Sequence, residues 1–199
     1  MKTRSERARA SVPRERSGAP GSPRADVLGV RGRSPRIKID VLILMGSDSD
    51  AAVMSAARET LAGFGLASEM TVASAHRSPA RVLRLVEDAP GRGVKVFIVG
   101  AGAAAHLAGV VAAHTTLPVI GVPIDSSALN GLDALLSTVQ MPPGVPVATC
   151  AIGKPGATNA GILAAQMIAI ANPALAAKLV DYKRTLVEKV EAAAARVEK

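Results

Sequence analysis

The chain has 199 residues, of which 49% are hydrophobic and 20% charged, a composition typical of one globular domain and not of a disordered protein. Its aromatic residues are two Phe and one Tyr, which argues against a nucleic-acid-binding protein that stacks bases on aromatic rings. The net charge of +8 lies in the first 38 residues, which contain 11 Lys and Arg against 3 Asp and Glu. Residues 39–199 contain 13 of each sign, so the body of the chain is neutral.

Residues 1–36 are rich in Arg, Ser, Pro and Gly and show no hydrophobic periodicity, which predicts a disordered basic N-terminal extension. A nucleic-acid-binding arm and an organelle presequence remain alternatives for this segment. Residues 37–199 are expected to form one α/β domain.

The single cysteine, Cys150, excludes an intrachain disulfide and fits a reducing compartment, so we expect a cytoplasmic protein. No apolar run reaches the length of a membrane span, and the first residues lack the apolar segment of a secretory signal. We therefore expect no membrane association.

From residue 37 onward, short apolar runs alternate with helix-length segments. The runs that predict buried strands are 41–45, 70–73, 94–99, 118–122 and 145–152. The segments that predict helices are about 50–63, 79–89, 104–114, 129–138 and 156–171, followed by an amphipathic helix over about 173–197. This alternation predicts a three-layer, doubly wound parallel sheet of the flavodoxin-like type, with the C-terminal helix packed outside the sheet or on another subunit. The Pro-rich residues 140–147 predict an ordered loop, either a lid or a subunit contact.

Polar residues follow the first predicted strand as Gly46-Ser47-Asp48-Ser49-Asp50. In open parallel sheets, ligands bind beyond the carboxyl ends of the strands. The backbone N–H groups of this loop, the Ser hydroxyls and the helix that follows suit a phosphate, and the Asp side chains suit ribose hydroxyls. A simple helix cap is the alternative interpretation of the same residues.

The second strand is followed by Ser74-Ala75-His76-Arg77-Ser78-Pro79. Histidine exchanges protons near neutral pH, and arginine is a planar anion clamp. Ser78 is well placed to cap the helix that begins at Pro79. This loop is therefore the best candidate for the catalytic group.

Residues 100–107 follow the third strand and match G-x-G-x-x-A, but no acidic residue ends the next strand, so we do not expect a dinucleotide site. Small residues here favour close approach of a flat ligand, and His106 is expected in the same crevice, with a structural helix-start histidine as the alternative. His114 is expected to be structural, and Cys150 a buried, inert thiol. The histidines lack zinc spacing, and no metal site is predicted.

Four motifs therefore occur in order: Met45-Gly46-Ser47-Asp48-Ser49-Asp50, Ser74-Ala75-His76-Arg77, Gly100-Ala101-Gly102 through Ala105-His106-Leu107, and Val139-Gln140-Met141-Pro142. Together they resemble the class I N5-carboxyaminoimidazole ribonucleotide mutases of purine biosynthesis, over residues 38–188. The resemblance implies transfer of a carboxylate from the exocyclic nitrogen of that ribonucleotide to ring carbon four, without ATP, metal or organic cofactor. It also implies a homo-octamer with sites at subunit boundaries, and a functional link to the ATP-dependent synthetase that makes the substrate.

The resemblance implies a role for each matching residue. His76 is the catalytic acid and base. The substrate-binding set is Ser47 and Asp50 for the ribose phosphate part, Ser49 and Arg77 for its phosphate, Ser74, His106 and Leu107 in the pocket wall, and the backbone of Ala101, Gly102 and Ala103 against the imidazole and carboxylate.

Three residues depart from the family pattern: Ala103 replaces a Gly, Ala108 a Pro, and Ser78 a Thr. The extra methyl of Ala103 lies where backbone is expected to approach ligand. The closest alternative function is the class II reaction, direct carboxylation of aminoimidazole ribonucleotide with carbon dioxide. An alternative from another class is nucleic-acid binding through the basic extension.

Overall fold

The computed structural model describes residues 38–198, and the extension expected over residues 1–36 lies outside them. The described residues form a five-stranded parallel sheet in the order β2-β1-β3-β4-β5. The strands are β1 Val41–Met45, β2 Ser68–Val72, β3 Val96–Gly102, β4 Val119–Ile124 and β5 Ala148–Thr149. The predicted doubly wound parallel sheet is confirmed, and β2 and β5 are its edge strands.

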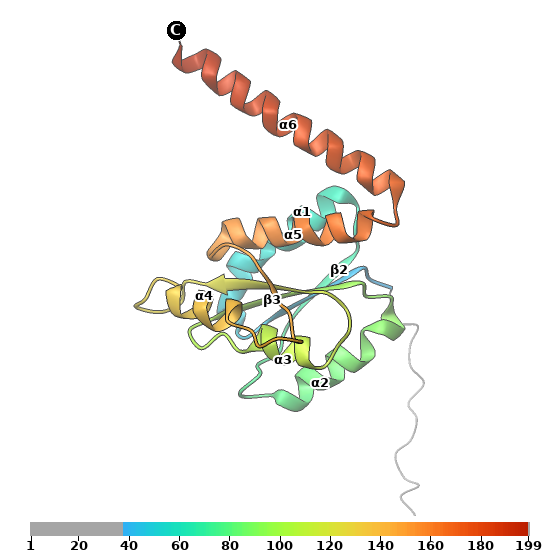
Figure 1. The fold of residues 1–199 in the computed structure, drawn as a ribbon, viewed down its shortest axis with the longest axis vertical. Helices are drawn as coiled ribbons and strands as arrows, with labels where there is room; N and C mark the ends of the chain where they lie inside the picture. Colours follow the sequence, from blue (N-terminus) through green and yellow to red (C-terminus); the bar gives the residue numbers. More distant parts are fainter. Residues whose placement is uncertain (1–37, 199) are drawn as a thin grey trace, which may run out of the picture. The chain divides into compact units, whose positions relative to one another are not determined.

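The helices form one layer on each face of this sheet, apart from the last helix, which lies outside these layers (Figure 1). They are α1 Ala51–Phe64, α2 Pro79–Asp88, α3 Leu107–Ala113, α4 Leu132–Val139, α5 Gly153–Ala169 and α6 Pro173–Val197, with short 3-10 turns at Asp48–Asp50 and Pro90–Arg92. Helices α1 and α5 cover one face, whereas α2, α3 and α4 cover the other. Each layer therefore buries one side of every central strand.

The core is aliphatic, and successive side chains of a strand point to opposite faces of the sheet. In β1, Val41 and Ile43 face α1 and α5, whereas Leu42 and Leu44 face the opposite helices. All four side chains are fully buried. An unbroken apolar run is what a strand covered on both faces requires, and it explains why β1 was recognisable from sequence.

Strand β3 is longer than predicted. It continues through Gly102, because Ala101 and Gly102 pair with Pro123 and Ile124 of β4. Glycine is a weak strand former, so the sequence indicated a loop from Gly100 onward. The loop begins instead at Ala103, and tertiary pairing overrides the local preference.

Strand β5 is shorter than predicted. Of residues 145–152, only Ala148 and Thr149 pair with β4 in a ladder, and the Cys150 N–H adds one hydrogen bond to the Gly121 carbonyl at 2.9 Å. Pro146 has no N–H, and Pro123 of β4 offers none either. Apolar residues alone were therefore a poor guide to strand length here.

Helix α6 lies outside the sheet, as expected, and its first turns pack on α1. Leu175 is buried, Lys178 Nζ donates to the Phe64 carbonyl at 3.0 Å, and the rings of Phe64 and Tyr182 meet edge to face at 5.5 Å. Further along, Val187 and Val190 are exposed. Among the described residues, no helix is both long and apolar enough to cross a membrane.

Candidate functional site

A pocket of about 310 Å³ lies at the carboxyl ends of the central strands, where a ligand site was predicted. The loops after β1, β2, β3 and β4 all contribute to it. Its lining residues are Gly46, Ser47, Ser49, Asp50, Ser74, Ala75, His76, Arg77, Ala101, Gly102, Ala104, His106, Leu107 and Ser126.

The loop after β1 is a reciprocal capping turn. The Ser47 hydroxyl accepts a hydrogen bond from the Ser49 N–H at 3.4 Å, and the Ser47 N–H donates to Asp50 Oδ2 at 3.1 Å. The two hydroxyls lie 2.9 Å apart. The predicted cap is therefore present, and the same Ser side chains still line the pocket, so capping and ligand binding do not exclude each other.

Asp50 is buried against this turn, with only 5% of its surface exposed. Burial raises the pKa of its carboxyl above the ordinary value, and outweighs the hydrogen bonds from the Ser47 N–H and the Ser49 hydroxyl, which lower it. The turn thus holds a carboxyl whose charged form is costly and which is ready to accept hydrogen bonds from a ligand.

The loop after β2 is closed by two serines. The Ser78 hydroxyl donates to the Ser74 carbonyl at 3.2 Å and accepts from the Ser74 N–H at 3.1 Å. Ser78 occupies the N-cap of α2, but its side chain caps no helix N–H, contrary to the role expected for it. Its hydroxyl closes the loop that carries His76 and Arg77 instead.

Arg77 connects this loop to the first one. Its Nη2 donates to the Gly46 carbonyl at 3.0 Å and its Nε to the Ser74 hydroxyl at 3.4 Å. A guanidinium has five N–H donors, so several remain for an anion. This geometry suits a phosphate lying between Arg77 and the Ser47–Ser49 turn.

His76 and His106 form a hydrogen-bonded pair in the pocket wall. His76 Nε2 and His106 Nδ1 lie 2.8 Å apart, and the rings are edge to face at 4.9 Å. One of the two nitrogens must carry the hydrogen, so a proton is held between two imidazoles facing the pocket. His106 stands at the N-cap of α3, but its ring contacts His76, which favours the functional interpretation over the structural one.

The loop after β3 brings backbone close to the pocket. A Cβ on Gly102 would lie 1.8 Å from Ser126 Oγ, so only glycine fits beside the loop that follows β4. Ala103 adopts φ +51°, a left-handed conformation that L side chains rarely take. The backbone of this loop therefore has two special positions. Gly102 fits the close approach of Ser126 because it has no Cβ, whereas Ala103 holds a left-handed conformation that is strained for alanine.

Most of the residues expected in the site line this one pocket. Ala103 does not: it is exposed, and its neighbour Ala104 lines the pocket instead. Ser126 was not expected there, although its place directly after β4, at the carboxyl edge, was a signal for it. His114 stands at the C-terminal end of α3, as expected. Cys150 is half-buried, and burial raises the pKa of its thiol.

The described part of the chain contains no group of three or more His, Cys, Asp or Glu side chains arranged to hold a metal ion. The pocket offers hydroxyls, one guanidinium, two imidazoles, one buried carboxyl and backbone N–H groups. Such a set is chemically suited to an anionic, hydroxyl-bearing molecule and to proton transfer.

Comparison with known proteins gives consistent results. The family model described as AIR carboxylase matches residues 40–189. An N5-carboxyaminoimidazole ribonucleotide mutase of Thermotoga maritima is 53% identical over 156 residues, which cover 78% of this chain and 90% of that protein. The Bacillus subtilis protein of the same name is 56% identical over 142 residues, covering 71% of this chain and 87% of its own.

Two further matches are a longer protein with a different name and a solved structure. A phosphoribosylaminoimidazole carboxylase of Candida glabrata is 51% identical over 156 residues, which make up only 27% of that longer protein. The crystal structure of Treponema denticola PurE superposes with a TM-score of 0.72 at 25% identity, covering 80% of this chain and 98% of that one. The family model spans most of the chain and the relatives share half of its residues, so the chain belongs to the AIR carboxylase family.

Proposed function

We propose that this protein is an isomerase that moves the carboxylate of N5-carboxyaminoimidazole ribonucleotide from the exocyclic nitrogen to ring carbon four, in purine biosynthesis. The observation that carries this proposal is the pocket in which the His76–His106 pair faces the Ser47–Asp50 turn and Arg77. Relatives with the name of this activity, identical at about half of the matched positions, support it.

In the proposed mechanism, the bond between the exocyclic nitrogen and the carboxylate carbon breaks, and protonated His76 gives its proton to that nitrogen. Aminoimidazole ribonucleotide and carbon dioxide are then held together in the pocket. Ring carbon four attacks carbon dioxide, and the proton lost from that carbon returns to His76. Atoms and charge balance without an added reagent, and an enclosed site favours recapture over escape of the gas.

His106 supports this proton transfer, because its Nδ1 lies 2.8 Å from His76 Nε2. A neighbouring imidazole can hold the catalytic ring in one orientation and share its proton. The remaining residues bind the nucleotide: Arg77 and Ser49 its phosphate, and Ser47 and Asp50 its ribose. The backbone of Ala101 and Gly102, with Ser74 and Leu107, completes the pocket around the imidazole and carboxylate.

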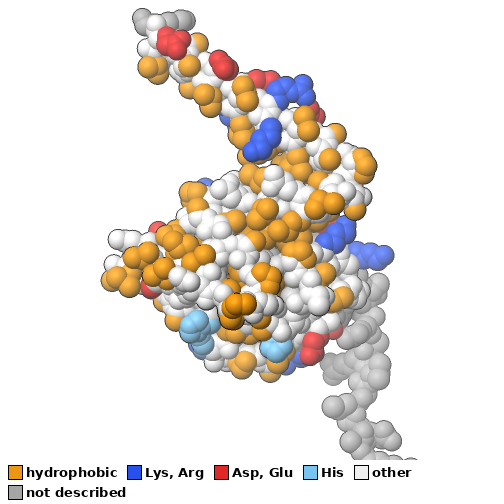
Figure 2. Space-filling view, in the orientation of Figure 1, with side chains coloured by type: hydrophobic (Ala, Val, Ile, Leu, Met, Phe, Trp, Pro, Cys, Tyr) orange, Lys and Arg blue, Asp and Glu red, His pale blue; other side chains and the backbone are white. Residues whose placement is uncertain are grey.

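The proposal also includes a homo-octamer, for which exposed apolar side chains offer support. Leu132, Leu136 and Val139 repeat at helical spacing on α4 and are each about half exposed. Figure 2 shows hydrophobic side chains on the surface of the body around α4 and along α6. Large exposed apolar areas are typical of surfaces that pack on another subunit.

The assembly is testable on α6. Val190→Glu should dissociate the octamer, because it puts a charge among the exposed apolar side chains, whereas Ala192→Glu adds the same charge on another side of the helix. Analytical ultracentrifugation measures the mass. A variant V190E that sediments like the wild type would argue against α6 as a subunit contact.

We further propose that the enzyme acts in the cytoplasm, because its one cysteine is free, and that it receives its unstable substrate from an ATP-dependent synthetase. Residues 37–199 act as the mutase domain in this proposal, without a metal or organic cofactor.

The central test is His76→Asn, which keeps a hydrogen-bonding side chain but cannot carry the proton. Turnover of N5-carboxyaminoimidazole ribonucleotide should fall by about 10²–10⁴-fold, the usual contribution of a general acid–base group. Binding of the nucleotide, measured by calorimetry, should persist. Near-normal turnover in this variant would refute the proton-transfer role.

The Candida glabrata relative, a carboxylase by name, raises a second candidate, direct carboxylation. The wild-type protein should be given either N5-carboxyaminoimidazole ribonucleotide or aminoimidazole ribonucleotide with bicarbonate. We expect faster turnover of the first, in line with the relatives that carry the mutase name. Faster turnover of the second would replace the mutase assignment.

A further inference from the structure

The loop that carries His76 connects the edge strand β2 to helix α2. Strand β2 pairs only with β1, so its outer side has no neighbouring strand. The Ala73 N–H donates to the Met45 carbonyl of β1 at 2.8 Å. Because backbone groups alternate sides along a strand, the Val72 carbonyl just before it points to the open edge. Val72 is paired with Met45 of β1, but its carbonyl, at the end of β2 before the catalytic loop, therefore has no strand to accept a hydrogen bond from.

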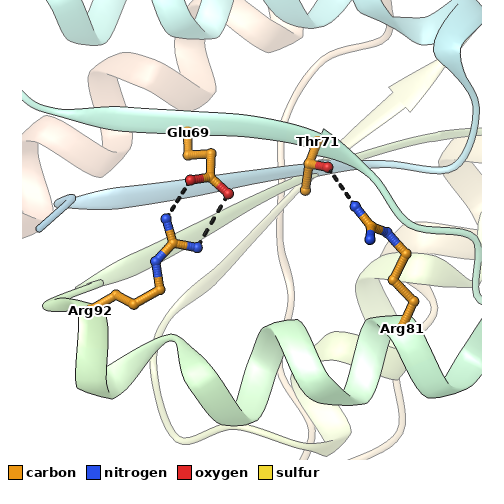
Figure 3. Close-up of polar contacts among 4 residues, drawn as sticks. All are labelled: Glu69, Thr71, Arg81 and Arg92. Atoms are coloured by element: carbon orange, nitrogen blue, oxygen red, sulfur yellow. Dashed lines mark hydrogen bonds and ion pairs between the residues drawn. The ribbon is translucent and has the colours of Figure 1, made fainter. Parts of the chain in front are cut away.

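Arg81 of α2 occupies this open edge. Its Nε donates to the Val72 carbonyl at 2.8 Å, and its Nη2 donates to the Thr71 hydroxyl at 2.9 Å. Figure 3 shows the Arg81 side chain reaching from the helix to Thr71 on the strand. One side chain thus ties the end of β2 to the first turns of α2, directly across the loop between them.

A second arginine ties the same strand to the same helical segment at the far end. Arg92 follows α2 and forms a two-pronged ion pair with Glu69, near the beginning of β2 (Figure 3). The two clamps anchor the same edge strand by similar chemistry. Only the Arg81 clamp lies next to the catalytic loop, which makes the Arg92 clamp a natural control.

The position of the His76 side chain depends on this loop more than that of its neighbour Arg77 does. The His76 side chain is hydrogen-bonded to His106, which comes from another loop. Arg77, by contrast, is anchored directly to the Gly46 carbonyl at 3.0 Å. If the loop shifts, the imidazole of His76 moves with the backbone, while the Arg77 guanidinium keeps an attachment to the turn after β1.

We propose that Arg81 is a positioning residue for His76: by pinning the end of β2 to α2, it sets the backbone from which the imidazole reaches His106. Arg81 is not among the residues that line the pocket, and in this proposal it takes no part in proton transfer. Its effect is on the alignment of the catalytic ring and not on the binding of the nucleotide. The kinetic part of this proposal rests on the proposed function.

The variant Arg81→Met keeps the length of the side chain but removes its donors. We expect kcat for N5-carboxyaminoimidazole ribonucleotide to fall about tenfold, with KM within about twofold of the wild type, because misalignment of the catalytic ring slows the chemical step more than it weakens binding. Arg81→Lys restores one donor and should recover part of kcat. Arg92→Met should lower the urea midpoint of unfolding and leave kcat unchanged.

A second measurement is independent of turnover. Diethyl pyrocarbonate modifies imidazole nitrogens, and a nitrogen engaged in a hydrogen bond reacts more slowly. In R81M, His76 should react several-fold faster than in the wild type, as measured by mass spectrometry of its peptide. The exposed His114 serves as the internal reference in every sample. In R92M, the rate at His76 should not change.

Two results would overturn the proposal. One is wild-type kcat and wild-type His76 reactivity in R81M. The other is an equal loss of kcat in R92M, which would mean that any loosening of β2 has this effect. If the wild-type protein does not convert the ribonucleotide at all, the proposed function fails, but the reactivity of His76 still tests whether Arg81 positions it.

Discussion

Asp50 is a residue in the site whose protonation is affected by its surroundings. Burial raises the pKa of its carboxyl above the ordinary 3.8, so the folded chain holds this proton more tightly than the unfolded chain does. The stability that this group contributes is full below the unfolded-state pKa and is lost as the pH rises through the folded-state pKa.

The variant Asp50→Asn therefore has a predictable pH signature. The free energy of unfolding of the wild type, relative to D50N, should decline as the pH rises from about 4 and become constant once Asp50 is ionised in the folded state. Urea unfolding at a series of pH values measures the difference. Asp48→Asn, an exposed neighbour in the same turn, should retain the wild-type trend, and a flat difference for D50N would contradict the assignment.

Ala103 is a second residue with a measurable cost. Its φ of +51° is unfavourable for a residue with a Cβ, by roughly 1 kcal/mol. Ala103→Gly relieves this strain but also adds freedom to the unfolded chain, so the free energy of unfolding should change by only about 0 to +0.5 kcal/mol.

The matched control is Ala104→Gly, one residue further along the same loop. Ala104 does not share the positive φ, so the same chemical change should lower stability by about 0.5–1 kcal/mol through added freedom of the unfolded chain. Thermal unfolding of both variants checks the sign. Equal effects would mean that the backbone of Ala103 is not strained.

At the level of elements, Met54 of α1 packs against Gly100 of β3, one residue before Ala101 in the pocket wall. A Cβ on Gly100 would stand 2.4 Å from Met54 Sδ, and Met54 is fully buried in α1. Gly100→Ala should cost about 1–3 kcal/mol of stability, the usual price of overpacking a filled core. It should also push α1 away from β3 and weaken nucleotide binding.

Gly63→Ala on α1 is the control for this change. A Cβ at Gly63 meets nothing within 4 Å, so the substitution should stabilise the helix by about 0.5–1 kcal/mol. Chemical denaturation of both variants measures the difference. Similar stabilities for G100A and G63A would contradict the close packing of α1 on β3.

The predicted elements differ from the observed ones mainly where glycine and proline occur. The all-apolar run of β1 was found at its correct bounds, because burial on both faces leaves a pattern in the sequence. The extension of β3 through Gly102 and the shortness of β5 were not found, because strand length there depends on the hydrogen bonds that β4 can offer. Local preference carries no information about a partner strand.

For the whole molecule, the distribution of charge leads to a prediction about residues 1–36. The body is neutral, and the pocket is built from residues between Gly46 and Ser126. Removal of residues 1–36 should therefore leave kcat and KM within about twofold of the full chain. A large loss of turnover would show that the segment is part of the enzyme.

The same truncation tests the alternative of nucleic-acid binding. If the full chain binds duplex DNA through its basic residues, affinity should fall by orders of magnitude between about 50 and 200 mM salt and disappear without residues 1–36. Filter binding at both salt concentrations measures this. Binding that survives the truncation would point instead to a basic surface on the body.

The sequence by itself determined the class of fold and the edge of the sheet at which the pocket lies. These features follow from the periodicity of apolar residues and from the rule that parallel strands present their carboxyl ends together. The tertiary structure alone decided that His76 meets His106 at 2.8 Å, that Ser126 lies against Gly102, and that Arg81 anchors the end of β2. Contacts between His76 and His106 and between Gly102 and Ser126 join loops on different strands, and Arg81 reaches back across a loop. Each depends on how strands and helices pack, which no local pattern of residues encodes.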